Sequence, residues 1–311
     1  MAMSYEKRML EELKMPTQKE VEQALLKSLF RNNGVIREFG VGEKTVEEIA
    51  DDFDLNEEQR TAYLETVYRK ENRVKRSYLW HRLLFRAADS LAKERLVSRP
   101  TQTVLLTNQK EWMLTEEGYN RTLEILDIPL TQKEILSIKS YEIQKIVKKI
   151  HKQERPQNYN PFESKKIVQI TRETKFRNRA FKQAVKEAYD FKCAVCGMKI
   201  HSPTNNLQWE VEAVHIVPHS KNGKDDLLNG LALCRLHHWS FDVGWFTLEE
   251  DFRVLASRKI ENLSVEFGKL ENYDFMRQLS KENLRISLPN EPDIYPHPNA
   301  IKWHRENVFC S

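Results

Sequence analysis

One stretch of the sequence decides the fold of the C-terminal half of the chain, and it falls into three pieces. They are Glu212-Ala-Val-His-Ile-Val-Pro-His219, Asn229-Gly-Leu-Ala-Leu-Cys234 and His237-His-Trp-Ser-Phe-Asp242. Imidazole, carboxamide, thiolate and carboxylate groups are concentrated here, and such groups transfer protons, orient loops and bind metal ions. We therefore expect a functional site built on residues 212–242.

A pair of cysteines precedes this stretch, in Cys193-Ala-Val-Cys-Gly197. Two thiolates three residues apart can turn onto one ion, and glycine permits the tight turn. Cys234 and His237 repeat this spacing, so the chain offers three thiolates and one imidazole, a ligand set suited to structural Zn²⁺. The alternative is that Cys193 and Cys196 are small core residues and His237 binds no ion. Four cysteines in 311 residues suit a metal site in a reducing compartment better than a disulfide framework.

From about Phe181 to Ser257 the sequence resembles the HNH family of ββα-metal nucleases. The resemblance rests on the histidine of Glu-Ala-Val-His, on Asn-Gly-Leu-Ala-Leu before a helix and on Phe-Asp-x-Gly after it. It implies an enzyme that hydrolyses DNA phosphodiester bonds with the help of a divalent metal ion. The tail from Leu288 to Arg305 also resembles the C-terminal extension of this branch of the family.

The resemblance assigns three catalytic positions. His215 corresponds to the general base that takes a proton from the attacking water, a task that suits imidazole because its pKa lies near working pH. Asn229 corresponds to the asparagine whose carboxamide holds the catalytic loop. His238 corresponds to the ligand of the catalytic ion, which neutralises charge on the scissile phosphate. We expect Mg²⁺, with Mn²⁺ or Ni²⁺ as alternatives.

The sequence departs from the family at Val214, where many relatives place an aspartate or histidine that binds the metal. Asp242 follows His238 by four residues, so on a helix both project from one face and could share the ion. Asp242 is therefore the predicted replacement ligand. Glu212 is less favoured, because on a strand it shares the face of Val214 rather than that of His215.

Several histidines leave their roles open. His237 and His238 could exchange the zinc and catalytic roles, although the spacing from Cys234 favours His237 for zinc. His219 follows a proline on a loop and is either a surface residue or a phosphate contact. His304 lies in the tail, where it either packs or helps to hold the substrate.

Positive charge is concentrated between Ser137 and Asp190. This segment has 14 Lys and Arg against 6 Asp and Glu, a charge of +8, whereas the whole chain carries +4. A basic amphipathic helix within it is expected to contact the DNA backbone. A solvated linker helix is the alternative. The predicted contacts are Arg172, Lys175, Arg177, Arg179 and Lys182.

The first 130 residues predict a winged-helix domain, because helical, strand and capping patterns follow in its order. The expected elements are a helix from Pro16 to about Asn32, a strand at Val35 and Ile36, helices at Thr45–Phe53, capped by Thr45, and Tyr78–Leu96, strands at Val104–Leu106 and Trp112–Leu114, and a helix at Thr115–Leu126.

Residues from about Pro16 to Leu126 also resemble the N-terminal domain of Mrr-type restriction systems. The resemblance rests on the segments Thr45–Asp52, Asn56–Arg60, Arg73–Trp80, Leu83–Glu94 and Leu114–Gly118. It implies DNA recognition, with Arg82 and Arg86 as predicted contacts, and restriction of modified foreign DNA. A winged helix that only dimerises is the alternative.

The predicted organisation is α+β and mainly α, in three parts. Residues 1–130 form the winged-helix domain, residues 131–165 a basic helical linker that contains a helix from Thr131 to Gln153, and residues 166–311 the nuclease domain with its extension. The composition, 40% hydrophobic and 31% charged, is typical of a globular protein. No stretch approaches a membrane span, and Met1–Met15 lacks the apolar core of a secretory signal, so we expect a cytoplasmic protein.

Double-stranded DNA, modified or not, is the predicted partner, and cutting both strands with one site per chain favours a homodimer. Two other functions remain open. The loss of a ligand at Val214 would suit a zinc-stabilised DNA-binding regulator with an inactive HNH remnant. A nicking nuclease with little sequence choice would use the same site chemistry.

Overall fold

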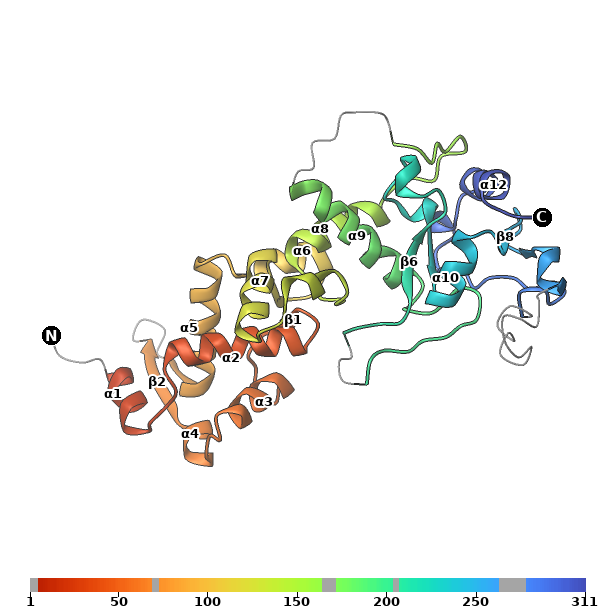
Figure 1. The fold of residues 1–311 in the computed structure, drawn as a ribbon. Coiled ribbons are helices and arrows are strands. Elements are labelled where there is room, and N and C mark those ends of the chain that lie inside the picture. The colour runs from red at the N-terminus through yellow and green to blue at the C-terminus, as the bar shows by residue number, and fades with distance from the viewer. Residues whose placement is uncertain (1–4, 69–72, 164–171, 204–206, 263–277) are drawn as a thin grey trace. The chain divides into compact units, whose positions relative to one another are not determined.

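The structure is a computed structural model that describes residues 5–68, 73–163, 172–203, 207–262 and 278–311 (Figure 1). The chain divides into two compact units. The first comprises Met1–Glu134 and Ile138–Gln144, and the second Ile135–Ser137 and Lys145–Ser311. Among the described residues, no helix is long and apolar enough to cross a membrane.

The N-terminal unit is mainly helical. Its helices are α1 (Tyr5–Glu12), α2 (Gln18–Arg31), α3 (Lys44–Asp52), α4 (Glu57–Thr61), α5 (Leu79–Lys93), α6 (Pro100–Thr107) and α7 (Glu116–Ile125). α2 begins at a capping box, in which Thr17 and Glu20 each accept a hydrogen bond from the other's backbone N–H. Helices α2 and α5 pack together over a core that includes Leu25 and Trp80, both at most 1% exposed.

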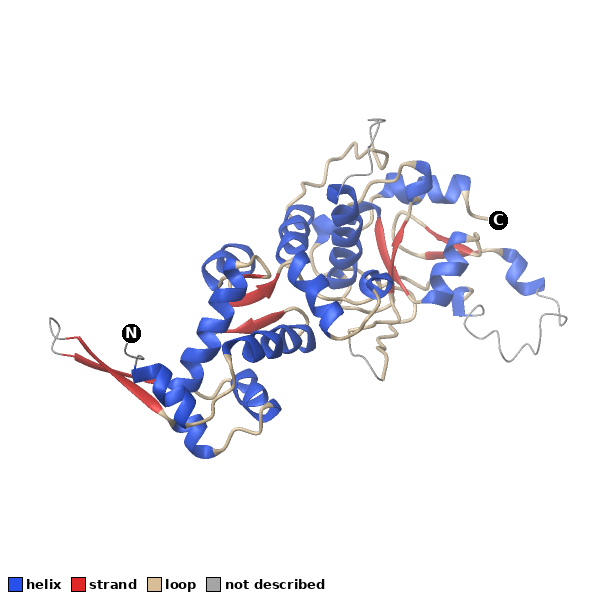
Figure 2. Cartoon of the chain, turned by 60° about the vertical axis from the view of Figure 1, so that its left-hand side comes forward, coloured by secondary structure: helices blue, strands red, loops and turns tan. Residues whose placement is uncertain are grey.

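Two sheets accompany these helices. Strands β1 (Val35–Arg37), β5 (Glu111–Leu114) and β4 (Val97–Ser98) form an antiparallel sheet in the order β1–β5–β4. Strands β2 (Tyr63–Tyr68) and β3 (Arg73–Tyr78) form a separate hairpin that stands away from the helices (Figure 2). The strands at Val35 and at Trp112 confirm the prediction, whereas the hairpin was not anticipated.

The predicted strand at Val104–Leu106 is wrong, because these residues lie in α6. Pro100 occupies the first turn, where its missing N–H costs nothing, and the Gln102 side chain accepts from the backbone N–H of Arg99 at 3.1 Å. Asn108 then ends the helix in the left-handed conformation, at φ 59°. Capping therefore outweighed the β propensity of the apolar residues. The capping of α3 by Thr45 is also wrong, since Glu43 is its N-cap and Thr45 lies inside the helix.

The predicted helix from Thr131 to Gln153 is wrong as a single element. Residues Leu130–Glu134 form a 3₁₀ helix, and the α-helix α8 spans only Tyr141–His151. Between them Ser137 donates its backbone N–H to the Leu207 carbonyl at 2.9 Å, and Lys139 donates to the Asn33 carbonyl at 3.1 Å. The backbone of this segment is thus hydrogen-bonded to turns that are distant in the sequence, and cannot also form a helical ladder.

Gly34 explains how this segment reaches the N-terminal unit. Its φ is +85°, which favours glycine, and a Cβ atom placed there would lie 2.0 Å from the carbonyl oxygen of Lys139. Any side chain at this position would therefore push the two backbones apart.

In the C-terminal unit a two-stranded hairpin, β6–β7, contacts helices α9 and α10. Its principal elements are α9 (Arg172–Ala188), β6 (Glu212–His215), β7 (Gly230–Leu233), α10 (Arg235–Asp242), β8 (Phe246–Leu248), β9 (Val254–Ala256) and α12 (Pro298–Asn307). β6 and β7 are antiparallel, with His215 opposite Gly230, and α10 follows β7 directly. α9 packs so closely on this hairpin that a Cβ at Gly230 would lie 2.6 Å from Val185. The glycine after Asn229 is therefore required by packing.

Candidate nuclease site and metal centre

His215 ends β6 and is held on two sides. Its Nε2 lies 2.9 Å from Oδ1 of Asp225, and the two side chains are only 15% and 10% exposed. Its ring stacks on Phe181 of α9, with centroids 3.9 Å apart and an interplanar angle of 18°. A carboxylate only accepts hydrogen bonds, so Nε2 carries the proton and Nδ1 presents its lone pair. This is the tautomer that a general base needs.

Asp225 is the residue that the sequence analysis missed. It lies in the loop between β6 and β7, ten residues after His215. An acidic pair, Asp225 and Asp226, between a candidate base and Asn229 was the available signal. Asp226 has a structural role, since its Oδ1 accepts from the Tyr159 hydroxyl at 2.7 Å and from the Asn229 backbone N–H at 3.1 Å. Burial raises the pKa of Asp226.

Asn229 is fully buried and ties the loop to the hairpin. Its Oδ1 accepts from the Val217 backbone N–H at 2.8 Å, and its Nδ2 donates to the carbonyls of Val217 at 3.1 Å and Lys224 at 3.0 Å. These bonds cross the loop that carries Asp225, so Asn229 has the geometry of a residue that positions the His215–Asp225 pair.

His238 lies on α10 between two carboxylates. Its Nδ1 is 2.7 Å from Oε2 of Glu212, and its Nε2 is 3.2 Å from Oδ2 of Asp242. Burial disfavours the charged ring, but the carboxylates of Asp242 and Glu212 outweigh it and raise the pKa of His238 to about 9. The two carboxylates contact opposite nitrogens, so the three side chains do not converge on one point.

Glu212 contacts His238 on α10 and not His215. Val214, its neighbour on the same face of β6, is 1% exposed, whereas His215 on the other face meets α9. Strand alternation therefore separates Glu212 from His215 as predicted, but it brings Glu212 to His238. The sequence prediction preferred Asp242 over Glu212 as the replacement metal ligand, and it did not anticipate the contact between Glu212 and His238, because the packing of α10 on β6 is a tertiary feature.

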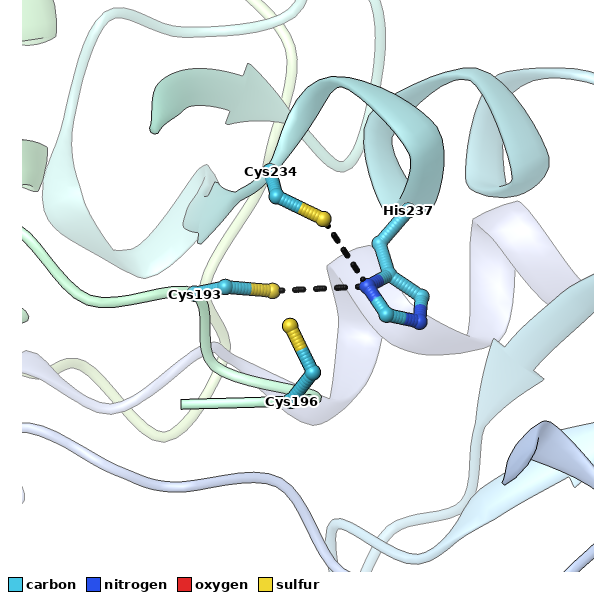
Figure 3. Close-up of side chains that lie close together, drawn as sticks. All are labelled: Cys193, Cys196, Cys234 and His237. Carbon is cyan, nitrogen blue, oxygen red and sulfur yellow. Dashed lines mark hydrogen bonds between the residues drawn. The ribbon is translucent and has the colours of Figure 1, made fainter. Parts of the chain in front are cut away.

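The four residues predicted to bind zinc come together (Figure 3). Cys193, Cys196, Cys234 and His237 bring one ligand atom each to within 4.8 Å of the others. Nδ1 of His237 lies 3.0 Å from the Cys234 sulfur and 3.6 Å from the Cys193 sulfur. Three thiolates and an imidazole from a tight turn and a helix start fit the chemistry of a tetrahedral Zn²⁺ site, so this group could hold zinc. The structure places His237, and not His238, in this cluster.

The predicted DNA-contacting residues differ in their surroundings. Arg177 is exposed and lies 3.6 Å from Glu163, Lys182 is half-buried, and Arg179 is buried at 6% exposure. The side chains of Arg172 and Lys175 lie outside the described residues.

Arg82 and Arg86 belong to the N-terminal unit and share one partner. Both donate to Oε2 of Glu6 in α1, at 2.9 and 2.6 Å. Both arginines were predicted to contact DNA, and their ion pairs with Glu6 were not predicted.

The two remaining histidines have different settings. His219 is exposed, with its ring centroid 6.1 Å from that of His215. His304 is 2% exposed and stacks on Phe241 at 3.6 Å, while its Nδ1 accepts from the Thr247 hydroxyl at 2.9 Å. Burial lowers the pKa of His304 to about 4. His304 therefore packs the tail, one of the two roles considered for it.

Comparisons with known proteins give a match to a family model and a similarity to a solved structure. No curated protein matches it. One solved structure, described as "Modification dependent TagI restriction endonuclease", is similar at 22% sequence identity and a TM-score of 0.30, over 41% of this chain and 37% of that chain. This chain thus spans little more than a third of that protein. The family model described as HNH endonuclease matches residues 193–249. The chain therefore contains an HNH endonuclease domain, within which the cysteine cluster, His215, Asn229 and His238 all lie.

Proposed function

We propose that this protein is a metal-dependent DNA endonuclease that hydrolyses phosphodiester bonds at its HNH site. The observation that carries the proposal is the pairing of His215 with Asp225 inside the HNH domain, because it leaves Nδ1 of His215 ready to accept a proton. Asn229 supports the pair through the three bonds it makes to the loop.

His215 and His238 have different roles in the proposed hydrolysis. Nδ1 of His215 takes a proton from water, the water oxygen forms a bond to phosphorus, and the bond from phosphorus to the 3′ oxygen breaks. His238 and Asp242 would hold the divalent ion, which would neutralise charge on the phosphate and the leaving oxygen, and Glu212 at the other ring nitrogen would orient His238. A ligand nitrogen must be unprotonated, so the ion competes with the proton that the two carboxylates stabilise on His238.

The Cys193, Cys196, Cys234 and His237 cluster would hold a structural Zn²⁺. It would fasten the turn after α9 to the start of α10, because the ligands come from these two places. His238 follows His237 directly, so the structural ion would set the position of the catalytic one.

For the N-terminal unit we propose a winged-helix arrangement that binds DNA through α5. Support comes from the element order α2, β1, α3, α5, β4, β5 and from the sheet order β1–β5–β4. Additional elements are α4 and the β2–β3 hairpin before α5, and α6 between β4 and β5. Arg82, Arg86 and exposed cations of α9 would contact phosphates. The resemblance to Mrr-type N-terminal domains supports modified DNA as the target, and double-strand cutting by one site per chain supports a homodimer.

Cleavage of supercoiled plasmid in Mg²⁺ or Mn²⁺ tests the nuclease assignment. The parent should cut, His215→Ala should lose cutting by about 10²- to 10⁴-fold, the usual contribution of a general base, and His201→Ala should cut normally, since His201 is an exposed histidine of the same unit. Undiminished cutting by His215→Ala would refute the assignment. Equal cleavage of matched plasmids with and without methylated or hydroxymethylated bases would refute only the preference for modified DNA.

The second candidate is a zinc-stabilised DNA-binding regulator. It is favoured by the buried Val214 in place of a ligand and by the lack of convergence among Glu212, His238 and Asp242. A parent protein that binds DNA and cuts none of the substrates in Mg²⁺, Mn²⁺ or Ni²⁺ would establish it.

A further inference from the structure

The N-terminal unit contains a cavity of about 370 Å³ beside α5. It is enclosed by the chain after β1, one face of α5, the start of α6 and Trp112 of β5. Its size falls at the lower end of the range for small-molecule sites, about 300 to 1,000 Å³. The site of the HNH domain lies in the other unit and does not use it.

Three aromatic rings form its apolar wall. Trp112 is 3% exposed and is fixed in the sheet, with Phe39 stacked on it at 6.1 Å and Phe85 set edge-on to it at 5.9 Å. Phe85, in contrast, is 57% exposed, although the other large apolar residues of α5 are buried. An exposed phenylalanine backed by a buried tryptophan is a rigid platform on which a planar ligand can stack.

The polar groups of the cavity include two carboxylates, an imidazole and a guanidinium. Glu38 is exposed and lines the cavity after β1. Asp89 lies 2.8 Å from Arg99 and 3.0 Å from Lys93, and its hydrogen bonds with these two cations lower its pKa. His81 completes the wall with a ring nitrogen 3.3 Å from the Phe39 carbonyl oxygen. Imidazole, guanidinium and a neutralised carboxylate suit a planar ligand whose edge carries both donors and acceptors.

The charge around the cavity fits a phosphate-linked ligand. On α5 the cavity-lining residues His81, Phe85 and Asp89 are spaced by four and form one stripe, and Arg82 and Arg86 form the stripe next to it. Glu6 is shared by two arginines, and Asp89 by Arg99 and Lys93. Each trio has two cations and one carboxylate, so each keeps one net positive charge, and Glu38 at the cavity offsets one of the two. The balance beside the aromatic wall is therefore positive.

We propose that this cavity receives one unpaired nucleobase of the bound DNA, with its face on Phe85 and its polar edge toward His81 and Asp89. Base–aromatic stacking is tolerant of sequence and adds affinity for a base that has left the duplex stack. The inference rests on the proposed function, in which α5 contacts DNA, and it specifies the feature of the DNA that the N-terminal unit reads.

Binding measured without cleavage tests the proposal. The full chain carrying His215→Ala is titrated by fluorescence anisotropy against labelled duplexes that contain one mismatched base, each of the four in turn, or an abasic site at that position. The protein should bind at least one mismatched duplex more tightly than the abasic duplex. Adding Phe85→Ala should weaken binding of that duplex by roughly 5- to 150-fold, the range for the loss of one stacked base, and should remove its advantage.

Leu105→Ala is the matched control, because Leu105 is 79% exposed on α6, and it should preserve the difference. An unchanged preference in the Phe85→Ala chain, or equal losses on mismatched and abasic duplexes, would overturn the proposal. Phe85-dependent binding of tetramethylammonium in place of a base would overturn the choice of ligand. Binding is measured without cleavage, so the two proposals can fail separately. If the parent cuts plasmid but Phe85 makes no difference to binding of the mismatched duplex, only the proposed base site is refuted. If Phe85 makes that difference but the parent never cuts DNA, only the proposed nuclease activity is refuted.

Discussion

His237 and His238 are adjacent on α10 and have opposite surroundings. His237 is 2% exposed and faces three cysteine sulfurs that converge with it on one small volume. The side chain of His238 is 28% exposed and lies between two carboxylates that contact its two nitrogens from different sides. Neighbouring residues on a helix point about 100° apart, so one turn of helix serves two sites. The closed cluster suits the proposed structural Zn²⁺, and the more open surroundings of His238 suit the proposed catalytic ion.

The largest effect is expected at the closed cluster. Cys234→Ser should abolish zinc binding and lower the thermal midpoint of the C-terminal unit sharply, since structural zinc contributes on the order of 10 kcal/mol in small sites, and cleavage should disappear with the fold. Metal analysis and calorimetry measure this. Cys310→Ser is the control, because Cys310 is an exposed cysteine outside the cluster. Zinc content and melting that match the control would contradict a structural role.

His238→Ala should reduce cleavage without affecting zinc binding. Cleavage should fall by at least about 100-fold, because a ligand of the catalytic ion is lost, whereas zinc content and the thermal midpoint should stay near those of the parent. Plasmid cleavage, metal analysis and melting of one preparation provide the comparison. If zinc is lost together with activity, the two histidines act in one site and the distinction drawn between them fails.

Asp225→Asn tests the pairing that supports the base. The amide keeps the size of the side chain but can donate a hydrogen bond, so the tautomer of His215 is no longer determined, and the maximal rate should fall by about 10- to 100-fold with little change in substrate affinity. Asp190→Asn, an exposed aspartate of the same unit, is the control. A loss of affinity with an unchanged maximal rate would assign Asp225 to DNA binding.

The smallest effect concerns His304, a buried histidine that stacks on Phe241 and hydrogen-bonds to its carbonyl. Its pKa is about 4 in the folded protein and 6.5 in the unfolded chain, so between these values the unfolded chain binds more protons and stability falls as pH falls. Between about pH 7.5 and pH 5 the free energy of unfolding should drop by about 2 kcal/mol through this residue.

Urea unfolding of the parent and of His304→Gln at both pH values measures this contribution. The glutamine cannot titrate, so its pH dependence should be smaller by that amount, while His151→Gln should behave like the parent. Identical pH dependence in all three proteins would show that His304 does not carry the effect.

The elements of the C-terminal site followed largely from local sequence. The two halves of the cysteine cluster, the hairpin around Asn229 and the helix that carries His238 each rest on spacings of a few residues, which fix turns and faces without reference to distant parts of the chain. The elements that were wrong, at Val104–Leu106 and in the segment after Thr131, lack such spacing. Capping and long-range backbone hydrogen bonds decided them instead.

The sequence by itself determined which residues are able to bind zinc, because ligands three residues apart are brought together by any tight turn or helix start. The spacing favoured His237 over His238 and left an exchange open, and the tertiary structure placed His237 with the cysteines. Only the tertiary structure decided that Asp225 pairs with His215, that Glu212 meets His238 and that Phe85 stands exposed beside Trp112. Each of these contacts depends on how a loop, a strand and a helix pack against one another. That packing is set by the free energy of the whole unit, and a sequence spacing of a few residues does not specify it.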